Sequence, residues 1–359
     1  MLYDSCMKIA IITDTHFGVR NDSSDFLDYF IRFYDEVFFP TLTKRGIKTI
    51  LHLGDVVDRR KYISYVTLRR MRETFINRLQ GYEVHVLVGN HDIPYKNTND
   101  INAMRELFSG IDGIKLYTDP AEVTVGDCPM LFLPWINQEN YQASIDLMRT
   151  TKAQVAMGHL EVKGFDMYRG MPSHEGFEPA TFDKFDIVCS GHYHHMSRKG
   201  NIRYLGAPYE MIWSDCSDPR GFHIFDTETR EFEFIQNPFT IFKKVWYDDD
   251  GKTAEKVMES APDVAGKHVK VIVQGKTNPY LFDLFMGKLY ASSPIDVSVV
   301  EDHRNMDAIS DDELLSEAED TLTILSKYIQ ALEIGVDKAN LEKLMRGLYN
   351  EAIMMESAE

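Results

Sequence analysis

Cysteine is scarce in this chain of 359 residues, which has four of them. They lie far apart, at Cys6, Cys128, Cys189 and Cys216, and none forms a CxxC pair. This spacing provides neither a zinc knuckle nor a disulfide framework. The pattern is typical of a reduced, cytoplasmic protein.

Long apolar runs are also absent. No stretch approaches the roughly 18 consecutive apolar residues that a membrane helix needs, and the first ten residues do not resemble a secretory signal. We therefore expect no membrane association. With 44% hydrophobic and 26% charged residues, the composition is that of a globular chain. At roughly 150 residues per domain, the length fits two domains, or one large domain with an appendage.

Positive charge is in deficit, because 39 Lys and Arg stand against 56 Asp and Glu, a net charge of −17. That sum argues against a general nucleic-acid coat protein. The charge is unevenly placed, however. Residues 301–359 hold 15 acids and 5 bases, whereas residues 59–78 hold seven bases and one acid. The second segment has the charge expected of a DNA contact.

Five short runs rich in Ile and Val recur along the first half of the chain and are typical of buried strands. They are Lys8–Thr13, Thr49–Leu53, Val84–Val88, Gln154–Met157 and Asp186–Cys189. Between the first three, Phe26–Leu42 and Tyr62–Leu79 carry apolar residues at helical spacing. Alternating strands and helices predict an α/β domain.

Polar side chains that can bind metals follow each of these runs. The seven with suitable donors are Asp14, His16, Asp55, Asn90, His159, His192 and His194. In open α/β sheets, ligands bind at the carboxyl ends of strands. Seven nitrogen and oxygen donors without a thiolate suit manganese, iron or zinc, and are too many for one ion with open positions. They fit two ions roughly 3.5–4 Å apart, the arrangement that hydrolyses phosphoesters.

The alternative is that these histidines are ordinary turn residues, which is the commoner role of a lone histidine after a strand. The order DTH, GDVVD, GNHD, GH and GHYH, each after a strand, favours the metal site. These motifs resemble those of the calcineurin-like metallophosphoesterases. The segments GDVVDRRKYISYVTLRRMRETF and VGNHDIPYKNTND are similar to the SbcD/Mre DNA-repair nucleases, particularly their T-even-type bacteriophage members. The resemblance covers about residues 7–240 and implies a β-sandwich flanked by helices.

The resemblance also implies how the ligands divide. Asp14, His16, Asp55 and His194 would hold one ion, and Asp55 would bridge to a second ion held by Asn90, His159 and His192. The cofactors implied are two divalent ions, Mn²⁺ first and Mg²⁺ as the alternative.

Two further residues would act on the substrate side. His91 would stabilise or protonate the leaving oxygen, and Asp58 would orient His91. Phosphoprotein phosphatases of the superfamily also carry Asp followed by Arg at this place, as Asp58-Arg59 does here. A phosphatase acting on phosphoproteins or small molecules is therefore the alternative function. A non-catalytic scaffold is a weaker one, because all seven ligands are present.

Arg59, Arg60, Lys61 and Lys96 are the expected phosphate contacts. The alternative for this basic segment is a solvated helix face, or a dimer interface of the kind that family members form there. Of the other histidines, His52 and His85 are expected inside strands, and His195 breaks the alternate spacing of the ligands. His174 lies in a loop that could reach substrate.

Beyond residue 240, the pattern strand, helix, strand predicts a small α+β module over 241–305. Its elements are expected at Val269–Val273, Tyr280–Tyr290 and Ile295–Val300. In the family, such a module caps the nuclease domain of residues 1–240.

Residues 306–359 carry two helical apolar stripes, interrupted by Gly335. The stripes could pack on each other or on the body of the protein. The resemblance favours a helical hairpin that binds an SbcC-type, SMC-like ABC ATPase, with two nuclease subunits in a heterotetramer. The expected activity is manganese-dependent hydrolysis of DNA, as a double-strand 3′–5′ exonuclease and single-strand endonuclease, in the host cytoplasm if a phage encodes the chain.

Overall fold

The computed structural model describes residues 7–108, 110–168 and 171–301, and five single residues further on: Ile329, Lys338, Leu341, Leu344 and Met345. The chain divides into two compact units, Met1–Glu301 and Asp302–Glu359. The five single residues are helical, and the rest of the predicted hairpin lies outside the described residues. In the described part of the chain, no helix is long and apolar enough to cross a membrane.

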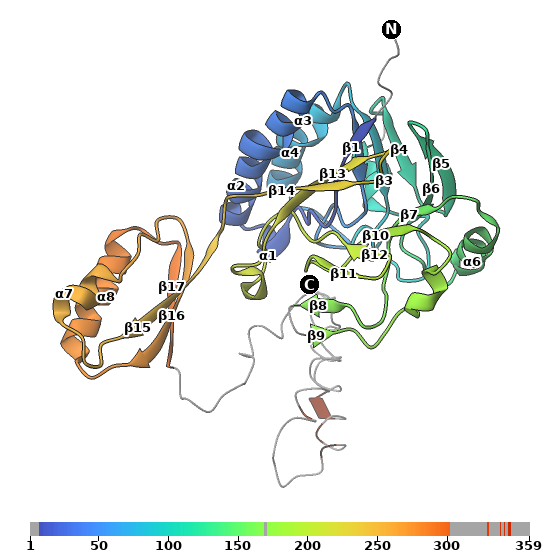
Figure 1. Ribbon diagram of the computed structural model, residues 1–359. Helices are drawn as coiled ribbons and strands as arrows, with labels where there is room; N and C mark the ends of the chain where they lie inside the picture. Colours follow the sequence, from blue (N-terminus) through green and yellow to red (C-terminus); the bar gives the residue numbers. More distant parts are fainter. Residues whose placement is uncertain are drawn as a thin grey trace. The chain divides into compact units, whose positions relative to one another are not determined.

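Two six-stranded sheets form the body of the first unit (Figure 1). The first has the order β14-β13-β1-β2-β3-β4, and β1 to β4 run parallel. Its strands are β1 (Lys8–Ile12), β2 (Thr49–His52), β3 (Glu83–Leu87), β4 (Ile114–Tyr117), β13 (Gly221–Asp226) and β14 (Phe232–Gln236). The second has the order β11-β12-β10-β7-β6-β5. Its strands are β5 (Ala121–Val125), β6 (Cys128–Leu133), β7 (Val155–His159), β10 (Ile187–Gly191), β11 (Ser197–Lys199) and β12 (Ile202–Tyr204).

The core between the sheets follows from the alternation of side chains along each strand. Ile9 and Ile11 of β1 point into a cluster that includes Phe132 of β6 and Met157 of β7. The intervening side chain of Ala10 joins the cluster on the opposite face, among helical aromatics. Both faces of β1 are therefore buried, which explains its uninterrupted apolar run.

Helices cover the outer face of the first sheet (Figure 1). The predicted helix Phe26–Leu42 is found as α2 (Ser24–Phe33), a π-helical segment (Tyr34–Phe38) and α3 (Phe39–Arg45). The predicted helix Tyr62–Leu79 is found as α4 (Tyr65–Thr74) and a 3₁₀ turn (Ile76–Leu79). The shorter elements are α1 (Val19–Asp22), α5 (Ala103–Phe108), α6 (Tyr141–Thr150), β8 (Asp166–Tyr168), β9 (Met171–Pro172) and 3₁₀ turns at Pro179–Phe182 and Trp213–Asp215. The α/β sandwich predicted from the sequence is confirmed.

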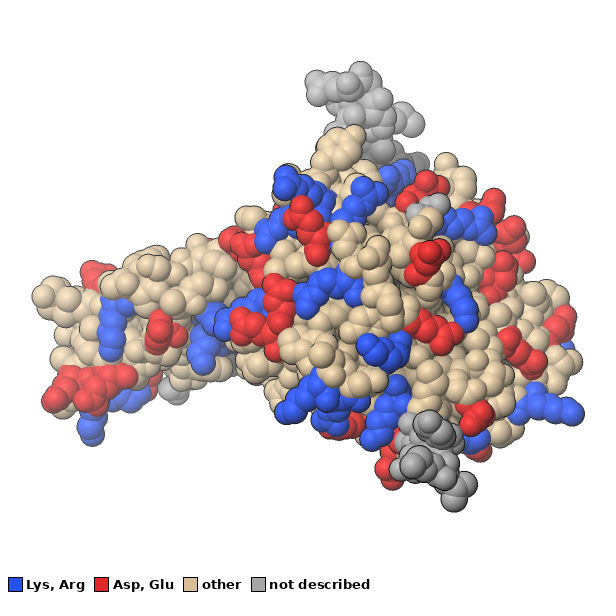
Figure 2. Space-filling model, turned by 90° about the horizontal axis from the view of Figure 1, so that it is seen from above, with Lys and Arg blue, Asp and Glu red and all other residues tan. Residues whose placement is uncertain are grey.

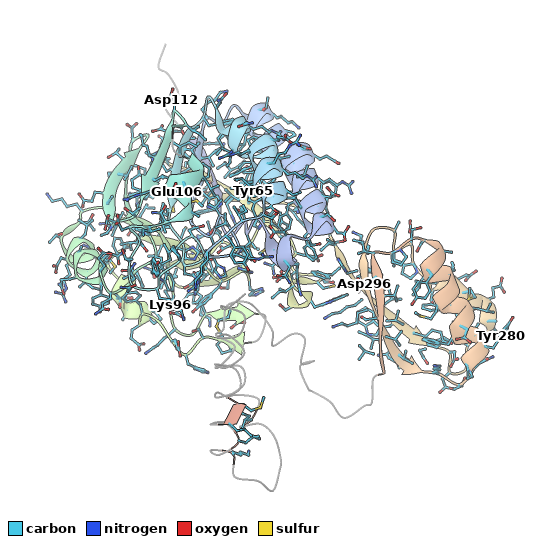
Figure 3. All side chains as sticks on the ribbon, turned by 180° about the vertical axis from the view of Figure 1, so that it is seen from behind. Tyr65, Lys96, Glu106, Asp112, Tyr280 and Asp296 are labelled. Atoms are coloured by element: carbon cyan, nitrogen blue, oxygen red, sulfur yellow. The ribbon has the colours of Figure 1, made fainter. Side chains whose placement is uncertain are left out.

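A three-stranded parallel sheet with its own core follows the sandwich. Its elements are β15 (Phe242–Asp248), α7 (Ala254–Glu259), β16 (His268–Gly275), α8 (Pro279–Ala291) and β17 (Asp296–Glu301). The sequence predicted β16, α8 and β17 but not the short α7. Figure 3 shows Tyr280 at the start of α8 and Asp296 at the start of β17. A separate sheet and core support the predicted boundary near residue 240, which stays a prediction.

Candidate metal centre

Four of the seven predicted ligands have left-handed backbone conformations. The φ angles are 53° at Asp14, 39° at His16, 55° at Asp55 and 88° at His192. Residues other than glycine rarely adopt such angles, and each costs about 1–3 kcal/mol. These residues follow β1, β2 and β10, where the chain turns sharply at the carboxyl end of the strand. The strained turns direct the side chains to one edge of the sandwich.

Two glycines permit these turns to approach each other. A Cβ at Gly191 would contact Thr13 and lie 2.9 Å from Oδ2 of Asp14. A Cβ at Gly89 would contact the main chain and carboxylate of Asp55. Any side chain there would displace a predicted ligand, so glycine is required by close packing.

The first group of ligands comprises Asp14, His16 and His194, which can each offer one ligand atom within 4.8 Å of the others. Nε2 of His194 lies 3.1 Å from Nε2 of His16. The main-chain N–H of His192 donates to Oδ1 of Asp14 at 3.0 Å. The turn after β10 therefore holds the carboxylate that follows β1.

The second group comprises Asp55, His159 and His192, within the same distance of one another. Oδ1 of Asn90 lies 2.9 Å from both Nε2 of His159 and Nδ1 of His192. Oδ2 of Asp55 lies 3.3 Å from Nε2 of His159 and 3.7 Å from Nε2 of His16, a member of the first group. Asp55 thus stands between the two groups, and the structure brings all seven predicted ligands together.

The donor set suits two divalent cations. Nδ1 of His159 lies 2.9 Å from the carbonyl oxygen of Leu53, which fixes the proton on Nδ1 and leaves Nε2 free to bind a metal. Asp14 and Asp55 are almost fully buried, so their charges need compensation. Burial lowers the pKa of His159, but the charge of Asp55 raises it to about 9. Burial likewise opposes the protonation of His16, but its pKa is raised to about 9 by a hydrogen bond that the His16 ring donates to the Asp58 carboxylate and by the charge of Asp55. Bound cations would supply this positive charge and leave both imidazoles neutral.

Asp92, to which the sequence assigned no role, holds the second motif in place. Its carboxylate accepts hydrogen bonds from the main-chain N–H groups of Asp55 at 2.9 Å, Val56 at 2.8 Å, Val57 at 3.2 Å and Gly89 at 2.8 Å. Burial and the neighbouring charge of Asp55 raise the pKa of Asp92 to about 6. The last letter of the GNHD motif was the signal that could have pointed to it.

His91 lies beside the predicted metal ligands, and with His16 and Asp55 it forms a third group whose atoms are close enough to hold an ion. Its ring centre is 4.8 Å from that of His16, and its main-chain N–H donates to Oδ1 of Asp55 at 2.8 Å. Nδ1 of His91 lies 2.5 Å from the main-chain oxygen of Asp58. The Asp58 carboxylate lies 3.3 Å from Nδ1 of His16 instead. Asp58 therefore contacts His91 through its backbone, and a predicted metal ligand through its side chain.

Acidic residues neutralise much of the basic segment, which the sequence could not show. Four arginines of residues 59–78 form ion pairs: Arg59 with Asp22 at 3.2 Å, Arg69 with Glu73 at 2.9 Å, Arg70 with Asp28 at 2.5 Å, and Arg78 with Asp35. Figure 2 shows basic and acidic side chains interspersed in this way on the face that it views. Four of the seven bases in this segment therefore have an acidic partner within the fold.

The other predicted phosphate contacts differ in their surroundings. Arg60 is partly buried, and although burial lowers its pKa, the charge of Asp55 acts on it in the opposite direction. This places Arg60 within electrostatic reach of the metal centre. Lys61 and Lys96 are exposed, and Lys96 is labelled in Figure 3 on the loop after the GNHD motif. Arg60, Lys61 and Lys96 remain predicted phosphate contacts.

Four further histidines were singled out in the sequence: His52, His85, His174 and His195. His52 and His85 are buried within strands. Nδ1 of His195 lies 2.8 Å from the carboxylate of Asp218 and not toward the centre. His174 is exposed in its loop.

Comparisons with known proteins show the family to which the chain belongs. The family model described as calcineurin-like phosphoesterase matches residues 7–196. Exonuclease subunit 1 of Enterobacteria phage T4 is 34% identical over 359 aligned positions, which cover 96% of this chain and 99% of that protein. A solved structure described as a novel archaeal phosphodiesterase aligns with 64% of this chain and 100% of its own, at 13% identity and a TM-score of 0.33. The chain belongs to the calcineurin-like phosphoesterase family.

Proposed function

We propose that this phosphoesterase hydrolyses DNA, as a double-strand 3′–5′ exonuclease and a single-strand endonuclease. The observation that carries the proposal is the convergence of seven nitrogen and oxygen donors into two neighbouring groups, with Asp55 of the second group 3.7 Å from His16 of the first. The relative from phage T4, which aligns over nearly the whole of both chains, is named an exonuclease subunit.

The chemistry divides between cations and side chains. Two divalent ions, Mn²⁺ or Mg²⁺, would activate a water molecule for attack on phosphorus and offset the charge of the phosphodiester. With both ring nitrogens protonated, His91 would give its Nε2 proton to the leaving oxygen as the phosphorus–oxygen bond breaks. Its Nδ1–H donates to the main-chain oxygen of Asp58, which sets the ring and leaves Nε2 for this transfer. Arg60 would contact a non-bridging phosphate oxygen.

The phosphatase alternative depends on Arg59, which would grip a phosphate monoester. In the structure its guanidinium pairs with Asp22 at 3.2 Å and donates to Oδ1 of Asn21 at 3.1 Å. Arg59 would have to leave both partners to bind substrate. This favours the phosphodiesterase.

The relative's name, a subunit, also supports a partner. We propose that residues 306–359 bind an SMC-like ABC ATPase of the SbcC type, and that two nuclease subunits assemble with it in the cytoplasm. A chain truncated after residue 301 should retain nuclease activity and fail to co-elute with the ATPase on a sizing column. Co-elution of the truncated chain would overturn the assignment of the tail.

The activity is tested with the purified full chain and Mn²⁺ on three substrates: end-labelled duplex DNA, circular single-stranded DNA and para-nitrophenyl phosphate. Cleavage of both DNA substrates is expected, and Asp55→Asn should abolish it. Hydrolysis of para-nitrophenyl phosphate alone would establish the phosphatase instead.

A further inference from the structure

An indole ring stands beside the metal centre, and none of the roles above uses it. Trp135 lies in the loop that follows β6, with its ring centre 5.1 Å from that of His192 and 6.1 Å from that of His159. His159 is fully buried, whereas Trp135 and His192 are partly exposed. The indole therefore flanks the accessible side of the second group of ligands.

The backbone of Trp135 is held on three sides. Its N–H donates to the carbonyl oxygen of Val88 at 2.8 Å, which ties it to the end of β3. Its own carbonyl oxygen accepts hydrogen bonds from the side-chain amides of Asn99 at 2.9 Å and Asn140 at 3.0 Å. Asn137 links these two, because its amide donates to Asn99 at 2.8 Å and its N–H donates to Asn140 at 2.9 Å.

This cluster of buried asparagines gives a structural role to the loop after the GNHD motif, which the sequence suggested only as a phosphate contact. Asn99 lies in the polar loop after the GNHD motif, which the composition alone would assign to solvent. Asn99, Asn137 and Asn140 are instead 4%, 8% and 4% exposed. Buried polar side chains that satisfy one another make a rigid support. The network fixes the place of Trp135 relative to the metal ligands.

The N–H and the ring face of the indole are available for further contacts. Its N–H donates to no residue that the structure describes and is not among the buried polar atoms, so this edge of the ring is accessible. An aromatic face beside a phosphodiester-cleaving centre is a stacking surface for a nucleobase, and such stacking tolerates any base. A simple phosphate monoester would gain nothing from it.

We propose that Trp135 stacks on an unpaired nucleobase next to the scissile phosphate, and so makes the centre selective for nucleic acid over simple phosphate esters. The inference rests on the proposed hydrolysis of DNA. Trp135 would contact the substrate directly and determine specificity. The occupant is a base freed from pairing, at a frayed duplex end or in a single strand.

The test compares an oligothymidylate with an oligomer of abasic sites of equal length, which has the same phosphodiesters and no bases. Trp135→Leu keeps apolar bulk against His192 and removes the stacking surface. We expect kcat/KM on oligothymidylate to fall by about 5- to 100-fold, and kcat/KM on the abasic oligomer to be unchanged. Equal losses on both oligomers would show that Trp135 only supports His192, and would overturn the inference.

A binding measurement keeps the inference testable without turnover. Of the three tryptophans, Trp213→Phe and Trp246→Phe together leave Trp135 as the only one. In calcium buffer, oligothymidylate should quench the fluorescence of this variant and the abasic oligomer should not. Equal quenching by both would contradict stacking. If the wild-type chain cleaves neither oligomer but quenching is selective for bases, the proposed hydrolysis fails while the contact stands.

Discussion

Oδ2 of Asp92 accepts a 2.9 Å hydrogen bond from the main-chain N–H of Asp55, the carboxylate that stands between the two groups of ligands. The same oxygen accepts the N–H of Gly89 at 2.8 Å, so one carboxylate joins the turns that follow β2 and β3. The position of Asp55 therefore depends both on β2 and on the hydrogen bonds to Asp92.

Asp92→Ala should therefore weaken Mn²⁺ binding on the order of 10–100-fold, as loss of a group that orients metal ligands does. It also leaves four buried N–H groups without their acceptor, so the midpoint of thermal unfolding should fall. Isothermal titration with Mn²⁺ and calorimetry would measure both effects. The exposed Asp112 provides the control, since Asp112→Ala should change neither. Wild-type affinity in Asp92→Ala would contradict this role.

Asp58→Ala should reduce Mn²⁺ affinity, because its carboxylate lies 3.3 Å from Nδ1 of the ligand His16. His91 should keep its orientation, since its acceptor is the main-chain oxygen of residue 58, which alanine also has. Saturating Mn²⁺ should thus restore most of kcat. A loss of kcat that excess metal does not repair would mean that the side chain orients His91 after all.

His91→Ala should lower kcat by on the order of 10²–10⁴-fold, the usual contribution of a general acid. Its metal content should stay the same, because the bond to Asp55 comes from the backbone N–H. Metal analysis of the purified variant separates the two properties. Loss of manganese from the His91→Ala variant would show instead that His91 is a metal ligand.

Gly191→Ala should disrupt metal binding although no ligand is changed. The added Cβ would lie 2.9 Å from Oδ2 of Asp14 and contact Thr13. Gly287 in α8 is the matched control, because nothing lies within 4 Å of its added Cβ. Gly287→Ala should raise the free energy of unfolding by about 0.5–1 kcal/mol and leave metal affinity intact. Normal Mn²⁺ affinity in Gly191→Ala would show that the turns can separate.

His223 should make the fold sensitive to acid. Burial, together with the charge of Arg203, lowers its pKa from 6.5 to about 4. Between these values the unfolded chain binds a proton that the folded chain excludes, so stability is full above pH 6.5 and is lost as the pH falls toward 4. The loss amounts to about 3 kcal/mol. Urea unfolding across this range should show a shallower pH dependence for His223→Phe than for wild type, and identical slopes would refute the assignment.

Much of the site could be predicted because its ligands follow strands. A strand is a local pattern, and parallel strands bring their carboxyl ends to one edge whatever lies between them. Asp14 and Asn90 follow strands of the first sheet, and His192 follows a strand of the second. Their meeting therefore also requires the two sheets to stack with these edges aligned, which no local pattern encodes. The small helix α7 was missed, since Ala254–Glu259 is too short for a helical period to stand out.

What could not be predicted depends on partners far away in sequence. Residues 59–78 do carry an excess of positive charge. Asp28 of α2 and Asp35 of the π-helical segment, however, form ion pairs with Arg70 and Arg78. Likewise, the carboxylate of Asp58 turns to His16, a contact that no motif spacing encodes. Side-chain orientation at the site, unlike the strand order, required the structure.

The four predicted ligands with left-handed backbone conformations affect which substitutions would stabilise this protein. At Asp14, His16, Asp55 and His192, glycine would relieve the backbone strain while deleting the metal ligand. A screen for heat resistance alone would therefore select changes at these four positions, which both strain the backbone and carry predicted metal ligands.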